Sequence, residues 1–249
     1  MSRLLPLLLL AATAFAQDAR QIVERSQSRH RSDSQQYEGV LKVFNPNGKN
    51  SEKRWKFSRL GDYGASKALL RFVSPPEVKG VALLIVNHPD KASDQWMWLP
   101  ELQRDRRVAL QDRSTRFFGT DFSYEDLEER DVDQSDYKLL GEETVDGQAC
   151  WKIESTPRKG KSSQYDRTVL WIRKDIEFPV QYEMYVKGQL VRKLHHGKVQ
   201  QVDGVWSSLE LEMTDLRRKG RTILELDKLQ YNAPLKDESF TLQALRRGE

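Results

Sequence analysis

Three carboxylates gather in one short run of this chain and are its first candidates for chemistry. Asp121, Glu125 and Asp126 lie within the nonapeptide GTDFSYEDL, residues 119–127. Glycoside hydrolysis needs two carboxylates placed across a cleft, but nothing in the sequence sets the separation of these three. Acids that follow a Gly-Thr pair are also common where a helix begins, because the helix dipole favours negative charge there. We therefore interpret them as residues that begin a helix.

The histidines and the single cysteine suggest no other chemistry. His195 and His196 are adjacent, so in a strand they point to opposite faces and cannot bind one metal ion. Cys150 is the only cysteine, and no base near it would activate a thiolate, so we interpret it as a small buried strand residue. The chain has no HExxH, GxSxG, P-loop or Gly-rich dinucleotide motif. We expect a protein that is not an enzyme and that uses no metal or cofactor.

Aromatic residues are concentrated around the same run. Trp96 and Trp98 alternate before Pro100, and a segment rich in phenylalanine follows. A chain this polar has no need of so many aromatics in one irregular segment unless something covers them. We predict a lid or rim in which Gly119 acts as a hinge, with Phe117, Phe118, Phe122 and Tyr124 as its aromatic residues. A loop that is merely pinned down by its phenylalanines is the other interpretation.

Arginines are frequent between the two aromatic groups, and four of them form the cluster that we consider: Arg104, Arg106, Arg107 and Arg113. They could contact lipid phosphates, a membrane surface or an acidic partner. We favour a solvated, charged strand edge, which opposes edge-to-edge aggregation.

Composition and charge restrict the class of protein. The 249 residues carry 41 basic and 37 acidic side chains, and the two signs are interleaved, which does not suggest nucleic-acid binding. Arg3, the apolar run from Leu4 to Ala14 and the small residues before Gln17 are typical of a signal peptide. We expect residues 1–16 to be removed, one domain over residues 17–249 and a periplasmic location.

Alternating patterns predict an antiparallel sheet over most of the chain. Turn signals between alternating runs occur at Asn45–Gly48, Asp146-Gly147, Lys187-Gly188, Asp203-Gly204 and Lys219-Gly220. A sheet with one apolar face must close, fold double or be covered by helices. We expect helices only at 18–31, 117–129 and 237–244. The predicted fold is mainly β: a single-domain, half-open antiparallel barrel capped by these few short helices.

The apolar faces of the strands supply the predicted wall of an interior cavity. Its residues are Trp55, Phe57, Leu70, Phe72, Trp96, Trp98, Tyr182, Met184 and Leu211. The other interpretation is that they simply pack a closed core, because apolar faces usually do.

Three runs resemble the outer membrane lipoprotein-sorting family of LolA-like periplasmic proteins. They are FVSPPEVKG at residues 72–80, DQWxxLP at 94–100 and, most specifically, GTDFSYEDL at 119–127. The resemblance covers essentially all of the mature chain and implies an incomplete barrel with a helical lid over an apolar cavity. The family's soluble carrier holds its lid with an arginine at the end of an early strand; Arg71 is the nearest match, and Arg54 and Arg106 are alternatives. The outer-membrane receptor's lipid-bearing cysteine has no counterpart here.

The resemblance implies a monomeric carrier for the acyl chains of lipoproteins or lipids. Its partners would be an inner-membrane transporter or exporter and an outer-membrane acceptor. An accessory protein of an RND-type membrane exporter, acting through its surface, is the alternative. Burying one methylene is worth about 0.8 kcal/mol, so a cavity that holds about a dozen would gain on the order of 10 kcal/mol before ordering costs.

Overall fold

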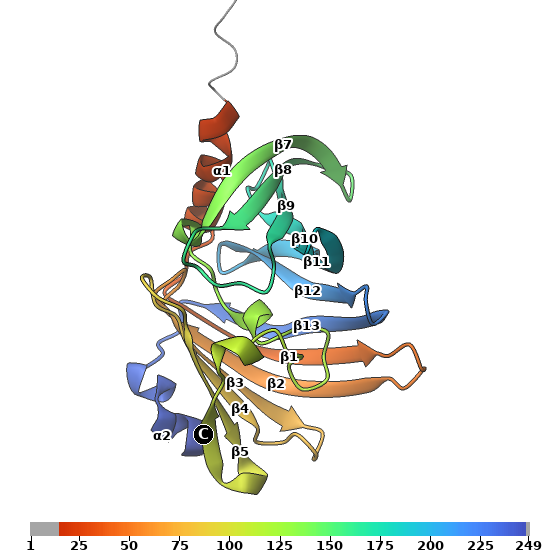
Figure 1. Ribbon diagram of the computed structural model, residues 1–249. Helices are drawn as coiled ribbons and strands as arrows, with labels where there is room; N and C mark the ends of the chain where they lie inside the picture. The colour runs from red at the N-terminus through yellow and green to blue at the C-terminus, as the bar shows by residue number, and fades with distance from the viewer. Residues whose placement is uncertain (1–14, 248–249) are drawn as a thin grey trace, which may run out of the picture.

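The computed structural model describes residues 15–247 of the chain (Figure 1). The first 14 residues, and with them nearly all of the predicted signal peptide, lie outside the described residues. Helix α1 (Phe15–Arg29) comes first, and α2 (Leu242–Arg247) ends the described chain. No helix in this part of the chain has the length and apolar character needed to cross a membrane.

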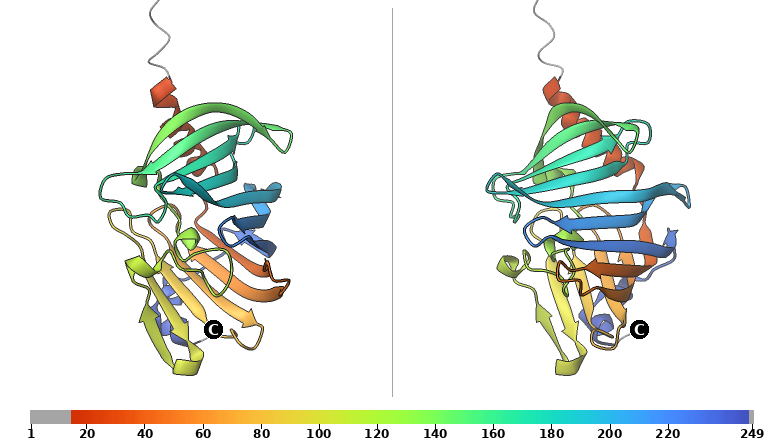
Figure 2. Two further views of the ribbon diagram at one scale, coloured as in Figure 1. Left: turned by 45° about the vertical axis from the view of Figure 1, so that its right-hand side comes forward. Right: turned by 90° about the vertical axis from the view of Figure 1, so that its right-hand side faces the viewer.

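Thirteen strands lie between the two helices. They are β1 (Ser34–Phe44), β2 (Ser51–Leu60), β3 (Lys67–Ser74), β4 (Ala82–Val86), β5 (Asp94–Leu99), β6 (Arg104–Arg107), β7 (Ser135–Val145), β8 (Gln148–Pro157), β9 (Arg167–Arg173), β10 (Pro179–Val186), β11 (Gln189–Val202), β12 (Val205–Asp215) and β13 (Gly220–Tyr231). All thirteen belong to one antiparallel sheet, in the order β6-β5-β4-β3-β2-β1-β13-β12-β11-β10-β9-β8-β7. The sheet is strongly curved (Figures 1 and 2).

The strand order leaves the two edge strands consecutive in the chain. Strands β1–β6 and β7–β13 each form a meander, and the pairing of β1 with β13 joins them. The edges β6 and β7 are connected by residues 108–134, which lie on the concave side of the sheet (Figure 2). This arrangement confirms the predicted half-open antiparallel barrel.

The predicted hairpins are confirmed because their turn residues adopt the backbone angles that tight turns need. Asp146 and Gly147 have φ of 48° and 76°, and Asp203 and Gly204 have φ of 48° and 81°. Positive φ at both central residues matches the twist of the strands on either side. Strand β4 is buried on both faces, as the continuous apolar run GVALLIV predicts.

Two of the three expected helices form. Helix α1 lies on the concave face, where Ala19, Ile22 and Val23 contact side chains of β8 and β9. A 3-10 turn (Asp237–Phe240) and α2 occupy the C-terminal position. The helix expected at 117–129 is wrong: only Glu125–Leu127 form a 3-10 turn.

The placement of Trp96 and Trp98 on the cavity wall is also wrong. Both side chains lie on the convex face of β5, in a cluster with Phe240 and Leu245 from the C-terminal turn and helix. The alternate residues Met97 and Leu99 face the concave side instead. Strand β5 is apolar on both faces because α2 covers the outer one.

A glycine in β1 determines how the concave face packs at its centre. Gly39 lies opposite Trp55 of β2, and the indole, 1% exposed, packs over the glycine backbone. A Cβ at position 39 would lie 2.0 Å from the indole nitrogen of Trp55 and 2.5 Å from its Cδ1. No side chain fits there unless the indole moves.

Replacement of Gly39 should therefore destabilise the protein. We expect Gly39→Ala to lower the free energy of unfolding by about 2–3 kcal/mol, because overpacking of a filled core typically costs this much. Gly197→Ala in β11 is the matched control: its Cβ would first meet the end of the flexible Glu210 side chain, at 3.2 Å. Urea denaturation measures both. An unchanged midpoint for Gly39→Ala would show that the indole does not lie over residue 39.

Candidate functional site

The concave face of the sheet is partly filled by the chain's own connection between β6 and β7. We call residues 113–128 of this connection the inserted segment. Phe117 lies at its centre, 1% exposed, with its ring centroid 6.1 Å from Trp55, 5.5 Å from Phe72 and 5.4 Å from Tyr124. The segment thus completes the apolar core of the half-open barrel.

The tip of the inserted segment is a tight turn with an unusual backbone. The Phe117 N–H donates to the Phe122 carbonyl at 2.8 Å, and the Thr120 N–H donates to the Phe117 carbonyl at 3.0 Å. Between them Phe118 and Gly119 have φ of 43° and 78°. A phenylalanine in the left-handed region costs about 1 kcal/mol, so contacts elsewhere must maintain the turn.

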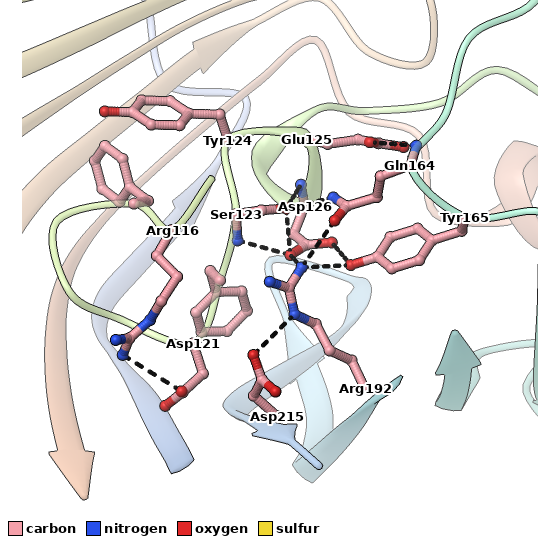
Figure 3. Close-up of polar contacts among 12 residues, drawn as sticks. Arg116, Asp121, Ser123, Tyr124, Glu125, Asp126, Gln164, Tyr165, Arg192 and Asp215 are labelled. Atoms are coloured by element: carbon pink, nitrogen blue, oxygen red, sulfur yellow. Dashed lines mark hydrogen bonds and ion pairs between the residues drawn. The ribbon is translucent and has the colours of Figure 1, made fainter. Parts of the chain in front are cut away.

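Asp126 provides the main polar anchor of the inserted segment (Figure 3). Its carboxylate accepts hydrogen bonds from Arg192 of β11 at 3.1 Å, from the Tyr165 hydroxyl at 2.7 Å, and from the backbone N–H and hydroxyl of Ser123, both at 2.7 Å. The Asp126 and Arg192 side chains are 4% and 9% exposed. Asp215 of β12 lies 3.7 Å from the other side of the Arg192 guanidinium.

Asp121 attaches the tip of the segment to β13. The Asp121 N–H donates to the Thr222 hydroxyl at 2.9 Å, and this hydroxyl donates to the Asp121 carboxylate at 2.7 Å. Burial raises the pKa of Asp121 above its ordinary value, while the bond from Thr222 opposes this. Arg116 lies 3.4 Å from the same carboxylate and donates to the Thr120 carbonyl at 2.7 Å and to the Gly119 carbonyl.

Two further glutamates complete the attachment. Glu125 accepts hydrogen bonds from the Gln164 N–H at 2.8 Å and from Arg130. Glu128 accepts one from Arg113 at 2.8 Å and one from the Gln95 amide of β5 at 2.7 Å. The acids of the GTDFSYEDL run therefore bind the inserted segment to β11, β13 and the 158–166 loop, and Glu128, the next residue, binds it to β5.

Seven of the nine predicted wall residues share the concave face with the inserted segment. Trp55, Leu70, Phe72 and Met184 are fully buried there, and Phe57, Tyr182 and Leu211 are partly exposed. The predicted lid residues Phe117, Phe118, Phe122 and Tyr124 all pack against them, and Gly119 lies at the exposed tip of the turn.

The concave face has two unlike regions. Beneath the inserted segment its side chains are closed off from solvent, as Trp55 and Phe72 show with 1% exposure each. Toward α1 the inner apolar side chains remain partly exposed: Tyr37, Phe57, Tyr182, Leu194, Leu211 and Leu226. Their partial burial raises the pKa of Tyr37 and Tyr182 above the ordinary value.

His196 lies in this second region, and His195 points to the opposite face as expected. The His196 ring lies 5.8 Å from that of Phe178 and 5.6 Å from that of Tyr182. Both of its nitrogens are buried and accept or donate no hydrogen bond among the described residues. Burial lowers the pKa of His196 to about 4. His195 instead contacts Asp146, at 2.6 Å.

Arg71 does not contact the inserted segment. It lies on the convex side, where its guanidinium donates to the Leu245 carbonyl at 2.8 Å and to the Ala244 carbonyl at 3.2 Å, both in α2. Its predicted place at the rim of the lid is therefore wrong. The alternation along β3 explains this, because Leu70 and Phe72 on either side of Arg71 face inward.

The arginine cluster divides between two roles. Arg104, Arg106 and Arg107 form most of the edge strand β6 and are exposed, which fits the charged strand edge that we favoured. Arg113 is instead 6% exposed and paired with Glu128. Cys150 is fully buried in β8 as predicted, and burial raises the pKa of its thiol.

Two hollows lie at the margins of the inserted segment. One, of about 430 Å³, is bordered by the Asp90–Ser93 loop, the inserted segment and the 159–164 loop, and most of its lining is polar. The other, of about 320 Å³, lies at the tip beside Arg116 and Asp121. Among residues 15–247, no group of three His, Cys, Asp or Glu side chains is arranged to hold a metal ion.

The sequence patterns did not identify the side chains that bind Asp121 and Asp126. Arg192, Tyr165, Asp215 and Thr222 lie on distant strands or loops and form no local pattern with the GTDFSYEDL run. One signal was available: Arg192 and Asp215 continue the inward alternation of their strands next to the apolar residues Leu194 and Met213. A charged residue in such a position needs a partner.

The chain was compared with protein families, curated sequences and solved structures. A family model with the description "uncharacterized protein" matches residues 64–247. No curated protein sequence matches the chain.

Three solved structures share the fold over nearly the whole chain. A domain assigned to the outer membrane lipoprotein-sorting proteins, from Vibrio parahaemolyticus, is 26% identical, with a TM-score of 0.88 over 93% of this chain and 100% of its own. A DUF1329 family protein from Desulfovibrio piger is 29% identical, with a TM-score of 0.89 over 94% and 100%. A LolA superfamily protein from Nitrosomonas europaea is 19% identical, with a TM-score of 0.72 over 93% and 100%.

The Asp126 anchor should dominate the stability of the inserted segment. We expect Asp126→Asn to lower the free energy of unfolding by about 3 kcal/mol, because it leaves the Arg192 charge buried with a weakened partner. The control is Asp136→Asn, which removes an exposed ion pair with Arg158 and should cost at most about 1 kcal/mol. Equal urea midpoints for the two variants would contradict the anchoring role.

His196 should make the protein less stable in mild acid. Its folded pKa of about 4 lies below the ordinary 6.5, so the unfolded chain binds a proton first as the pH falls. Neutral His196 therefore contributes on the order of 2–3 kcal/mol to the free energy of unfolding. This contribution is fully present above pH 6.5 and is lost as the pH falls toward about 4. Burial lowers the pKa of His30 as well, and it acts in the same direction.

The comparison of wild type with His196→Phe isolates this contribution, since His30 is common to both. Unfolding free energies at pH 7.5 and pH 4.5 should differ less in the variant, while the outer-face control His195→Phe retains the wild-type loss. If the unfolding free energies of wild type and His196→Phe fall equally between pH 7.5 and pH 4.5, the His196 ring takes up its proton as readily in the folded protein as in the unfolded chain. That result would contradict the lowered pKa.

Proposed function

This chain belongs to the LolA-like family of outer membrane lipoprotein-sorting proteins, and we propose that it is a periplasmic carrier for acyl chains of lipoproteins or lipids. The chains would bind on the concave face of the half-open barrel and move toward the outer membrane. The cargo's donor would be an inner-membrane transporter or exporter, and its receiver an outer-membrane acceptor. The carrier would act as a monomer, without a cofactor and without catalysis.

The observation that carries the proposal is the partly exposed apolar surface inside the barrel. Tyr37, Phe57, Tyr182, Leu211 and Leu226 belong to the inner cluster but are not closed off from solvent. A core that served only stability would bury these side chains, since each fully buried large apolar group contributes about 1.5–3 kcal/mol. An acyl chain laid along this surface would complete their burial.

The way in which the inserted segment is attached supports the proposal that it acts as a lid. It could move while the sheet stays folded. Apart from one isolated bridge within the segment, between Arg116 and Ser123, it makes no strand pairing, and side-chain hydrogen bonds attach it to the sheet. Release of its tip would expose the faces of Trp55 and Phe72 and lengthen the apolar surface toward the mouth of the barrel. Phe117, Phe118, Phe122 and Tyr124 would then be the mobile part of the wall, with Gly119 as a hinge.

The hydrogen-bond partners of three acids argue against the alternative that this protein is an enzyme. Asp121, Glu125 and Asp126 each have arginine or hydroxyl partners that occupy their oxygens. This favours an anchoring role for the carboxylates over acid–base chemistry. The exporter accessory protein remains the other functional candidate, and it differs from the carrier in needing no acyl binding.

A charge placed on the inner face should abolish acyl binding. We expect Leu211→Asp to weaken binding of a fluorescent C16 fatty acid at least about 100-fold, because a carboxylate against the chain costs several kcal/mol. The matched control is Thr214→Asp, the same new residue on the same strand but facing outward between Lys193 and Arg221. Circular dichroism confirms folding of both.

Three outcomes separate the candidates. Loss of binding in Leu211→Asp alone supports the carrier. Equal binding by folded Leu211→Asp and wild type excludes the inner face as the acyl site. No binding by the wild-type protein favours an accessory role through the outer surface.

A further inference from the structure

The second hollow lies at the mouth of the barrel, where the tip of the inserted segment meets two hairpin turns. Its lining consists of Asn45, Pro46, Asn47, Arg116, Asp121, Arg218 and Gly220. The first three belong to the β1–β2 turn, Arg218 to the β12–β13 turn and Gly220 to the start of β13. Arg116 and Asp121 belong to the inserted segment. We call this hollow the mouth pocket.

Two cations line the mouth pocket, Arg116 and Arg218, and a third lies near it. This third cation is Lys53, which pairs with Leu41 on the inward side of β2 and is close enough for the charge of Arg116 to act on it. Burial lowers the pKa of Arg116, and so does the charge of Arg218, although Asp121 opposes them. Burial and then Arg116 lower the pKa of Lys53. The charge of Arg116 is therefore opposed by those of Arg218 and Lys53, and Arg116 and Lys53 are partly buried while Arg218 is exposed.

The nearby carboxylates balance only part of this charge. Asp121 lies 3.4 Å from Arg116 and also accepts the Thr222 hydroxyl at 2.7 Å. Asp215 lies 3.7 Å from Arg192 and accepts the N–H groups of Arg217 and Arg218, both at 3.0 Å. Within residues 15–247, Arg218 and Lys53 form no ion pair, and the Lys53 ammonium donates only to the Ser51 hydroxyl, at 3.3 Å. An anion in the pocket would relieve this excess of positive charge.

We propose that the mouth pocket binds the phosphate group of an anionic amphiphile whose acyl chain occupies the apolar interior. This inference rests on the proposed carrier function and adds the class of cargo. Arginine guanidinium groups match phosphate geometry with paired N–H donors, and Lys53 adds a point charge. The Asn47 side-chain amide N–H group, which makes no hydrogen bond to the described residues, lies in the same lining.

Arg116 would couple phosphate binding to movement of the inserted segment. Its guanidinium holds the tip closed through the Gly119 and Thr120 carbonyls and sits next in the chain to Phe117, the central ring of the inner cluster. A phosphate is a stronger acceptor than a carbonyl because its hydrogen bonds are charge-assisted. A headgroup that draws Arg116 away from the tip removes two of the bonds that keep Phe117 in place.

The test compares two amphiphiles with the same C16 chain: lysophosphatidylglycerol, which carries a phosphate, and monoacylglycerol, which does not. Tryptophan fluorescence of the intact mature protein at low salt gives both dissociation constants below micelle formation. We expect wild type to bind the lysophosphatidylglycerol about tenfold more tightly. Arg218→Gln and Lys53→Gln should each lower this ratio about threefold without changing monoacylglycerol binding.

The control variant is Arg221→Gln, which removes the same charge from an exposed arginine on the outward side of β13, over the Phe44 ring. Its binding ratio should equal that of wild type. Arg218 is exposed and Lys53 makes one long hydrogen bond, so both substitutions leave the anchors of the inserted segment intact.

Each remaining outcome has one meaning. A wild-type ratio near one, with both amphiphiles bound, overturns the headgroup site and leaves the carrier function standing. A phosphate preference that survives in Arg218→Gln, Lys53→Gln and Arg116→Gln places the phosphate elsewhere. Binding of neither amphiphile overturns the carrier function itself. Binding of inorganic phosphate alone, lost in Arg218→Gln while the lipid ratio stays at one, identifies a free-phosphate site instead.

Discussion

The buried ion pair between Asp126 and Arg192 is the contact on which the interior of this protein depends. The edge strands β6 and β7 do not pair, and the chain must cross the concave face to connect them. A charge taken from water into that interior costs several kcal/mol unless its partners replace the lost hydration. Arg192, Tyr165 and Ser123 do so for Asp126, and they fix the crossing segment in one position. The phenylalanine rings then complete a core that the open sheet could not close by itself.

A segment held in this way would act as a lid that is both precisely placed and reversible. Polar contacts around its margin specify where the rings sit, while few backbone bonds tie the segment to the strands beneath. The apolar face under it therefore remains accessible at the cost of a limited number of hydrogen bonds. Acyl-chain burial of about 0.8 kcal/mol per methylene is of the right size to offset such a cost. The side chains left partly exposed toward α1 provide the place where burial could begin, and the cations at the mouth would orient the polar end of the cargo.

Local patterns in the sequence were sufficient for the strands and turns, because alternation and Asp-Gly or Lys-Gly pairs report directly on strand faces and hairpins. They failed at β5, where Trp96 and Trp98 alternate as an inner face would. Period-two alternation separates two faces without saying which one is inside, and the six-residue helix that covers the outer face leaves almost no signal. The Asp126–Arg192 pair was also beyond reach, since its members lie 66 residues apart and meet only once the sheet has curved. The resemblance to lipoprotein-sorting proteins placed the fold correctly, whereas the position of Arg71 follows from the register of β3 and not from the family pattern.

Native mass spectrometry of the protein purified from an osmotic-shock extract of its own cells, followed by lipid extraction, tests most directly whether the interior is an acyl-binding site. If the half-open barrel carries acyl chains, a fraction of the protein will have an added mass that extraction identifies as a lipid or an acylated protein. The same adduct will be absent from the Leu211→Asp variant purified in parallel. A single unliganded mass for the wild-type protein, together with no uptake of added fatty acid, would show that the barrel is a packed core and that the protein acts through its outer surface.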